Sequence, residues 1–142
     1  MNENITISLV NWNDRSEVLI YIRHEVFVKE QNVPLDLEID GLDYECYHVL
    51  AFDKENNPVG TARMMKDGHI GRVAVLKKQR GLGIGLMMMN KLMEKAGSLG
   101  IKEICLDAQV NVIEFYKRQG FNEIGEVFMD AGIEHKRMVR IL

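Results

Sequence analysis

The chain has 142 residues, of which 46% are hydrophobic and 27% are charged, and its formal net charge is −3. These values are typical of one globular domain, so we expect a single domain over residues 1–142 without a basic surface for nucleic acid. No apolar run approaches the ~20 residues that a membrane-spanning helix needs, which argues against a membrane protein.

The first half of the chain predicts one helix and then an antiparallel meander. Residues 5–10 alternate weakly between apolar and polar side chains and predict a first strand. Asp14 and Glu17 resemble a capping box, and apolar residues at helical spacing extend a helix to about Val28. An irregular acidic stretch with room for a short second helix follows. Turn residues then separate three more strands, at residues 47–53, 59–65 and 69–75.

The second half predicts a strand–helix–strand unit and a final hairpin. Apolar residues one turn apart predict a helix over residues 84–99, and residues 101–108 predict a buried strand. A short helix follows between residues 111 and 120, and the last two strands occupy residues 121–129 and 135–142. Because a strand–helix–strand crossover joins parallel strands, we expect a mixed α+β fold. Its sheet is mostly antiparallel around a central parallel strand pair, with helices on both faces.

The cysteines and histidines predict neither a disulfide framework nor a metal centre. Cys46 and Cys105 are far apart and belong to no C-x-x-C pair, so reduced thiols and a cytoplasmic location are expected. The four histidines show no metal-ligand spacing, and no structural metal is expected.

A glycine-rich segment between a strand and the long helix of the second half is the sharpest signal in the sequence. It reads Gln79-Arg80-Gly81-Leu82-Gly83-Ile84-Gly85. The first turn of a helix leaves N–H groups without partners, and its positive dipole end attracts anions. Glycines let phosphate oxygens approach the backbone, and Lys77, Lys78 and Arg80 add positive charge. The segment predicts a phosphate-binding loop, with tight strand–helix packing as the structural alternative.

Two common phosphate-binding motifs do not fit this segment. A nucleoside-triphosphate loop needs a lysine and then a hydroxyl residue after its last glycine, but Gly85 is followed by Leu86 and Met87. A dinucleotide fingerprint needs its third glycine where Leu86 stands, and it belongs to an all-parallel unit rather than after a meander. Both interpretations are therefore set aside.

The spacing Arg80-x-x-Gly83-x-Gly85 resembles the pyrophosphate loop of the GCN-five-related N-acetyltransferase (GNAT) superfamily. Upstream, residues 71–75 (GRVAV) look like the strand that pairs with pantetheine in that family. Downstream, residues 115–121 (FYKRQGF) look like its second cofactor motif, F-Y-x-x-x-G-F. Two motifs at the right separation are more specific than either alone, and they imply the GNAT fold.

A narrower resemblance, to the ElaA-like (YjcF-like) branch of the superfamily, extends over nearly the whole chain. It rests on residues 23–34 (RHEVFVKEQNVP) and on the spacing Glu38-x-Asp40-x-x-Asp43. Late in the chain, the segment 130–135 (DAGIEH) adds to it, together with Met138.

The family resemblance implies acetyl-CoA as cosubstrate and an amine as acceptor. By resemblance, the backbones of Val73, Ala74 and Val75 pair with the pantetheine arm where the strands bearing Val75 and Asp107 splay apart. An N–H near Val73 would then polarise the thioester oxygen. The pyrophosphate is expected on the loop residues Arg80, Gly81, Leu82, Gly83, Ile84 and Gly85. Asn111 is expected either to bond pantetheine or to cap the short helix.

Direct transfer also needs an acid and a base. Tyr116 occupies the motif position at which many family members carry the acid, and a phenol is protonated at neutral pH. Its structural alternative is packing in the core, which we expect of Phe115 instead. For the base that deprotonates the amine, His135 and Glu30 are rivals, and a water relay is a third alternative.

The cues to the acceptor point in opposite directions. The acidic residues between Asp36 and Glu45 form either a solvated loop or a rim that attracts a cationic amine. Arg63 and Arg72, on neighbouring strands, are instead placed to bind a substrate carboxylate.

Two other functions stay open: a transferase for a longer acyl-CoA, and a non-catalytic acyl-CoA-binding module. A homodimer is also open, through the edge strands of the final hairpin.

Overall fold

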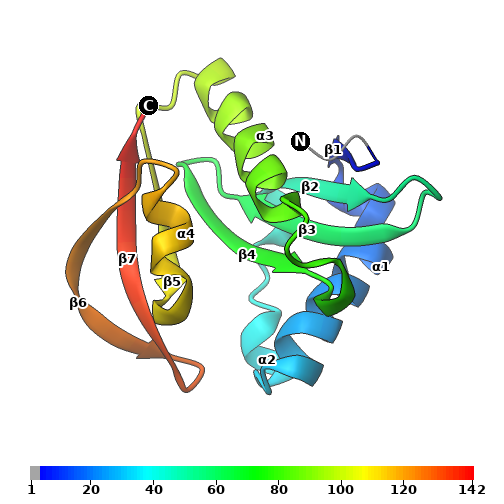
Figure 1. Cartoon of the computed structure of the whole chain (residues 1–142), viewed down its shortest axis with the longest axis horizontal. Helices are drawn as coiled ribbons and strands as arrows, with labels where there is room; N and C mark the ends of the chain where they lie inside the picture. The colour runs from blue at the N-terminus through cyan, green and yellow to red at the C-terminus, as the bar shows by residue number, and fades with distance from the viewer. Residues whose placement is uncertain (1–3) are drawn as a thin grey trace.

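The computed structural model describes residues 4–142, which form one mixed sheet flanked by helices (Figure 1). Within these residues, seven strands follow the order β1-β2-β3-β4-β5-β7-β6, and only β4 and β5 pair in parallel. The expected α+β fold is therefore confirmed. The strand bounds are β1 (Thr6–Val10), β2 (Tyr47–Phe52), β3 (Pro58–Met64), β4 (His69–Val75), β5 (Glu103–Gln109), β6 (Asn122–Asp130) and β7 (Ile133–Ile141).

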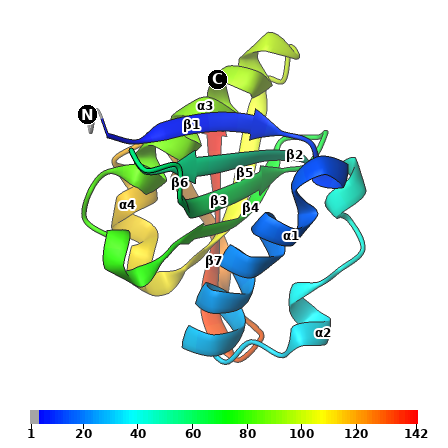
Figure 2. The same ribbon diagram turned by 90° about the vertical axis from the view of Figure 1, so that its right-hand side faces the viewer.

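Helices cover both faces of the sheet, as the sequence predicts (Figure 2). Their bounds are α1 (Trp12–Arg23), α2 (Leu35–Glu38), α3 (Ile84–Ser98) and α4 (Ile113–Lys117). Leu19 of α1 is buried in one cluster with Leu50 of β2, whereas Met88 of α3 is buried in another with Val49. Because neighbouring residues of a strand point to opposite faces, β2 supplies an apolar side chain to each helical layer.

The first helix begins earlier than expected and changes its winding before it ends. Asn11 caps α1 by accepting a hydrogen bond from the Asn13 N–H (2.9 Å), so the expected start at Asp14 is wrong. An asparagine one residue before the helix satisfies a first-turn N–H directly, which makes the later capping box unnecessary. After α1 the chain continues as a π-helix over His24–Glu30, which carries Glu30 to the strands at the centre of the sheet.

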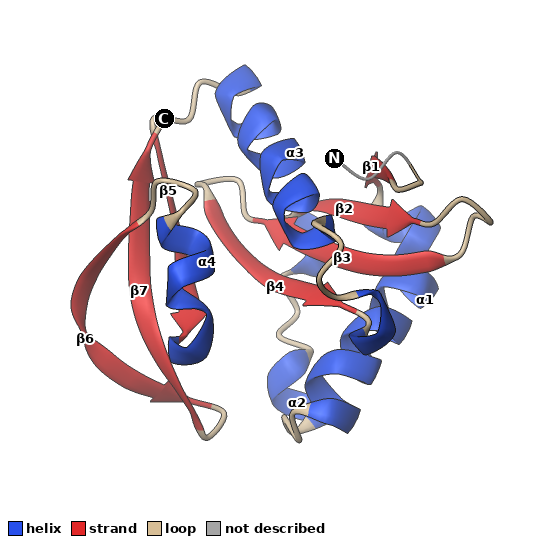
Figure 3. Cartoon of the chain, viewed as in Figure 1, coloured by secondary structure: helices blue, strands red, loops and turns tan. Residues whose placement is uncertain are grey.

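β4 and β5 pair only at the start of β4 and the middle of β5, and then they diverge (Figure 3). Their parallel pairing is confined to His69↔Cys105 and Ile70↔Leu106, whereas β5 stays paired with β7 along its whole length. On β4, the register with β3 shifts where Arg72 adopts a φ of +51°, which marks a β-bulge. Because a bulge bends its strand, the rest of β4 turns away from β5 and produces the splay that the family resemblance implies.

Other expectations concern the surface and the thiols. β6 forms one edge of the sheet and all of its residues are exposed, but a dimer through this hairpin stays a prediction. Both Cys46 and Cys105 are free thiols. No helix within residues 4–142 has the length and apolar character to cross a membrane. In the same part of the chain, no group of three or more His, Cys, Asp or Glu side chains is arranged to hold a metal ion.

Candidate functional site

A cavity of about 680 Å³ opens where β4 and β5 diverge. Its walls also come from the π-helix, α4, the start of α3 and the turn between β6 and β7. Of the predicted site residues, only Leu82 lies outside the lining. The others all line the cavity: Glu30, Val73, Ala74, Val75, Arg80, Gly81, Gly83, Ile84, Gly85, Asn111, Tyr116 and His135. A smaller cavity of about 380 Å³, beside the start of α1, contains none of them.

The glycine-rich segment and the first turn of α3 carry a row of backbone N–H groups beside this cavity. Within the described residues, no N–H from Gly81 to Leu86 donates to a protein acceptor, and no side chain caps α3. Gly81 and Gly83 both have a φ of +82°, a conformation that glycine adopts without steric cost. Together with the dipole of a 15-residue helix, these N–H groups form an anion site of the kind that binds phosphate.

Gly85 has a packing role besides its place in this loop. A Cβ on Gly85 would lie 3.2 Å from Cζ of Phe115, which is tighter than an ordinary contact. The absence of a side chain therefore lets the start of α3 approach α4 closely. The packing alternative considered for the glycines applies here, whereas a Cβ on Gly81 or Gly83 would meet no atom within 4 Å.

Arg80 ties the loop to two other elements rather than presenting an unmatched charge. Its guanidinium donates two hydrogen bonds of 2.6 Å to the Glu30 carboxylate and one of 3.0 Å to the Val75 carbonyl. The hydrogen bonds from Arg80 lower the pKa of Glu30, and in return they raise the pKa of Arg80. The expected positive charge of Arg80 is thus matched within the protein, and only the exposed Lys77 and Lys78 supply charge beside the loop.

Tyr116 combines a buried ring with an unengaged hydroxyl. The ring packs edge-on against Phe115 and Phe121, at centroid distances of 4.9 and 5.9 Å. Tyr116 is more deeply buried than Phe115, the reverse of what the sequence led us to expect, although both line the cavity. Burial raises the pKa of Tyr116 to about 12. Its hydroxyl makes no hydrogen bond within residues 4–142, so it is protonated and available to a ligand.

His135 has its proton fixed by the backbone. Its Nδ1 lies 2.7 Å from the Ile133 carbonyl oxygen, which can only accept, so in the neutral ring Nδ1 carries the hydrogen. The lone pair is therefore on Nε2, the atom that a general base needs. The ring stacks on Phe128 at 5.9 Å and lies opposite Gln109 of β5. Gln109 in turn donates to Gln31 at the end of the π-helix (2.8 Å).

Asn111 does not cap the short helix. α4 begins at Ile113 with Val112 as its N-cap, no side chain caps it, and Asn111 lies in the preceding 3₁₀ turn. That alternative for Asn111 is wrong, because the extra turn moves the helix start two residues downstream. Contact with the cofactor stays a prediction for this cavity-lining side chain.

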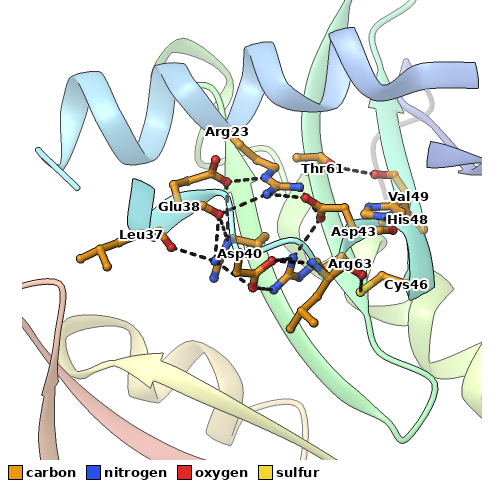
Figure 4. Close-up of polar contacts among 12 residues, drawn as sticks. Arg23, Leu37, Glu38, Asp40, Asp43, Cys46, His48, Val49, Thr61 and Arg63 are labelled. Atoms are coloured by element: carbon orange, nitrogen blue, oxygen red, sulfur yellow. Dashed lines mark hydrogen bonds and ion pairs between the residues drawn. The ribbon is translucent and has the colours of Figure 1, made fainter. Parts of the chain in front are cut away.

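Glu38, Asp40 and Asp43 of the acidic stretch form one largely buried ionic cluster with arginines (Figure 4). Asp43 accepts hydrogen bonds from Arg23 (2.7 and 3.1 Å) and from Arg63 (2.9 Å). Glu38 pairs with Arg23, and Asp40 pairs with Arg63. Arg23, Glu38, Asp43 and Arg63 are each at most 5% exposed. For Glu38 and Asp43 the solvated-loop and acidic-rim predictions are both wrong, because charges buried this deeply need partners within the protein. Asp40 is exposed but paired, whereas Asp36 and Glu45 are exposed as a solvated loop predicts.

Arg72 links this cluster to the bulge of β4. Its guanidinium donates to the carbonyls of Glu38 (3.2 and 2.9 Å) and Leu37 (3.4 Å), and to the Asp40 carboxylate (3.3 Å). Arg72 and Arg63 therefore bind the end of α2 and the segment after it instead of the substrate carboxylate that the sequence suggested. As a result, Leu37 and Glu38 are held in the wall of the cavity, which Val73 also lines and where the thioester is expected.

Sequence reasoning missed Arg23 and the glutamine pair. Arg23 follows Leu19 by four residues on the buried stripe of α1, and a charged residue in an apolar stripe is a signal for a buried ion pair. Nothing in the sequence relates Gln31 to Gln109, because only the splay of the strands brings them together.

Both the sequence and the fold of this chain are similar to those of known proteins. Residues 13–142 match the family model described as Acetyltransferase (GNAT) domain. The uncharacterized N-acetyltransferase YjcF of Bacillus subtilis is 44% identical over 124 residues, which cover 84% of this chain and 88% of YjcF. The crystal structure of Escherichia coli ElaA matches with a TM-score of 0.84 and 31% identity, over 95% of this chain and 99% of that one. An acyl-CoA N-acyltransferase from Pseudomonas aeruginosa gives a TM-score of 0.86 at 29% identity, over 96% and 99%.

Proposed function

Because the chain belongs to the acetyltransferase (GNAT) domain family, in the branch of ElaA and YjcF, we propose that it transfers acetyl from acetyl-CoA directly to an amine. Family membership makes it an acyltransferase. The acetyl donor, the amine acceptor and the direct route are the proposal. The observation that carries it is the row of unbonded N–H groups from Gly81 to Leu86, which faces the same cavity as Tyr116 and His135.

The proposed cofactor contacts follow the cavity wall. The N–H groups of the loop bind the pyrophosphate oxygens, with Lys77 and Lys78 adding charge from outside. The pantetheine arm takes the place beside β4 that β5 leaves open, pairing with the backbones of Val73, Ala74 and Val75. Asn111 bonds the arm from the opposite wall. In this arrangement the acetyl thioester lies beside the bulge at Arg72, where a backbone N–H polarises its carbonyl.

The proposed chemistry assigns one proton transfer to each of two side chains. The amine nitrogen attacks the thioester carbonyl, a C–N bond forms and the C–S bond breaks. His135 accepts the amine proton on Nε2, the ring nitrogen that its backbone contact leaves unprotonated. Tyr116 donates its hydroxyl proton to the departing thiolate. Its raised pKa of about 12 keeps it protonated until that charge appears.

Glu30 fits the role of base less well than His135. Both of its carboxylate oxygens accept hydrogen bonds from Arg80, and the same contacts lower its pKa. A carboxylate held in this way is a weaker proton acceptor. We therefore assign Glu30 to positioning the loop through Arg80.

Calorimetric titration with acetyl-CoA, with free CoA and NAD as comparisons, tests the cofactor assignment. Gly83→Trp is expected to abolish acetyl-CoA binding in a folded protein, because its ring would project into the open space in front of the loop. Gly100→Trp is the matched control. Gly100 has a φ of +76° and equally open surroundings, but it lies after the far end of α3. Equal binding by the two variants would remove the loop from the site.

A screen of amines with thiol release as the readout tests the transfer. Release that depends on an amine supports the proposal, and faster release from a longer acyl-CoA would replace acetyl as the transferred group. Tight cofactor binding without release for any amine would identify a non-catalytic acyl-CoA-binding module instead.

A further inference from the structure

The charges that line the cavity limit what the acceptor can be. Resting on the function proposed above, the geometry points to an acceptor that is an aliphatic amine with a second cationic group and no anionic group. The reacting amine lies at His135, and the second ammonium group lies at Asp130.

No cationic side chain of the lining is left for a substrate carboxylate. Arg72 and Arg80 are the arginines among the described residues that line the cavity. Arg80 is held by both oxygens of Glu30, and Arg72 is held by two backbone carbonyls and Asp40. The charge of Arg80 is thus matched by Glu30, and Arg72 belongs to a cluster in which three arginines face three carboxylates, so neither supplies an unmatched positive charge and an amino-acid acceptor is disfavoured.

Nearly all the lining carboxylates are also engaged. Glu30 is bound by Arg80, and Glu38 belongs to the buried cluster. Asp107 accepts two hydrogen bonds from Arg137, and His69 lies 3.7 Å from it. Asp130 is the remaining carboxylate, and it has no hydrogen bond or ion pair of its side chain within residues 4–142. The cavity lining therefore carries one unpaired negative charge, that of Asp130, which attracts a cation.

Asp130 lies close to the proposed base and on the same face of the hairpin. In the register of β6 with β7, Phe128 is opposite His135, and Asp130 is opposite Ile133. Residues two apart in a strand point to the same face at a separation of about 7 Å. Asp130 thus lies about 7 Å along β6 from Phe128, the residue opposite the proposed base His135. Ala131 and Ile133 line the cavity beside Asp130.

This spacing assigns Asp130 to a second ammonium group rather than to the reacting one. A carboxylate in contact with the reacting amine would stabilise its protonated form, and a protonated amine has no lone pair with which to attack. A carboxylate one step away can hold a distant ammonium group while His135 deprotonates the nearer amine. A chain of methylene groups between the two fits the apolar side chains at the turn.

The test uses three acceptors of equal chain length that differ in the far group: 1,4-diaminobutane, butylamine and 4-aminobutyrate. Thiol release from acetyl-CoA gives kcat/KM for each. We expect kcat/KM for 1,4-diaminobutane to exceed that for butylamine by up to about fivefold per reacting amine, because a partly exposed ion pair contributes about that factor. We expect 4-aminobutyrate to have the lowest kcat/KM. The preference for the diamine should shrink in about 0.5 M salt, because salt screens exposed charges.

Asp130→Asn should bring the ratio of kcat/KM for the diamine to that for butylamine close to one when it is counted per reacting amine, because the diamine carries two equivalent amines. Glu134→Gln is the matched control, because Glu134 is an exposed carboxylate on the same hairpin but does not line the cavity. It should keep the wild-type ratio. A ratio unchanged in Asp130→Asn, or lowered equally in both variants, overturns the role of Asp130.

The outcomes also separate this inference from the proposed function. A best rate with 4-aminobutyrate leaves the transferase intact and overturns the acceptor class. Acetyl-CoA binding without release for any of the three acceptors also overturns the acceptor class, and the broad amine screen then decides the function separately.

Discussion

Neutralising Asp43 is the sharpest test of the buried ionic cluster. Asp43 is 3% exposed and accepts hydrogen bonds from two guanidinium groups, Arg23 and Arg63. In Asp43→Asn the side chain keeps its shape but loses its charge. Three arginines, namely Arg23, Arg63 and Arg72, then face only two carboxylates, those of Glu38 and Asp40. The variant therefore leaves one positive charge buried without a counterion.

The expected loss in the free energy of unfolding is large. Removing one partner of a buried ion pair costs about 3–5 kcal/mol, because the remaining charge stays desolvated. For a domain of this size, about 3 °C per kcal/mol applies, so the Tm should fall by about 9–15 °C. Thermal and urea unfolding followed by circular dichroism measure both quantities.

An exposed ion pair provides the control for this variant. Glu25 pairs with Lys29 at 2.9 Å, with 32% and 61% of their side chains exposed, so Glu25→Gln should hardly change the Tm. If Asp43→Asn destabilises the protein no more than Glu25→Gln, the cluster is not the stabilising feature that its burial suggests.

The pH dependence supplies a second readout. Burial alone would raise the pKa of Asp43, but hydrogen bonds and charge from Arg23 and Arg63 bring it below its ordinary value. Since the folded pKa is the lower one, the carboxylate stabilises the fold above about pH 4 and loses this effect as the pH falls further. The difference in unfolding free energy between wild type and Asp43→Asn should therefore narrow below about pH 4. A constant difference would contradict the assignment.

Three further variants address the proposed catalytic residues. Tyr116→Phe should lower kcat about tenfold or more and leave the Kd for acetyl-CoA nearly unchanged in calorimetry, since the ring packing is kept; equal activity would exclude Tyr116 as the acid. His135→Ala should remove the acidic limb of the pH–rate profile, and an unchanged limb would exclude His135 as the base. Glu30→Gln should release Arg80 and weaken acetyl-CoA binding severalfold while keeping the shape of that profile. A lost limb in this variant would instead make Glu30 the base.

The sequence predicts the fold well because most of its signals are local. The apolar stripe of Ile84, Met88, Leu92 and Ala96 predicts α3, and each of these residues is buried. Turn residues predict the meander and the final hairpin. The parallel pair follows from the single strand–helix–strand crossover. The loop before α3 follows from its glycines and from the N–H groups that the start of a helix leaves without partners.

The parts that the sequence does not predict depend on pairing between distant residues. Arg23 and Asp43 are 20 positions apart, and Gln31 and Gln109 are 78 apart. The sequence shows an arginine at position 63 and an aspartate at position 40, but it does not show that their side chains form an ion pair. Taken separately, the acidic residues predict either a solvated loop or a rim for a cationic amine, and the arginines predict a carboxylate site. Only the folded arrangement shows that the two sets cancel, and that Asp130 does not take part.

Arg72 shows how the strand, the cluster and the cavity depend on one another. A non-glycine residue with a φ of +51° costs roughly 1–2 kcal/mol, so the bulge needs compensation. Glycine would relieve that strain, but only a long cationic side chain can reach the carbonyls of Leu37 and Glu38. The contacts that offset the strain also fix the end of α2 in the wall of the cavity. The same residue therefore lies at the bulge that bends β4 away from β5 and holds part of the cavity wall in place.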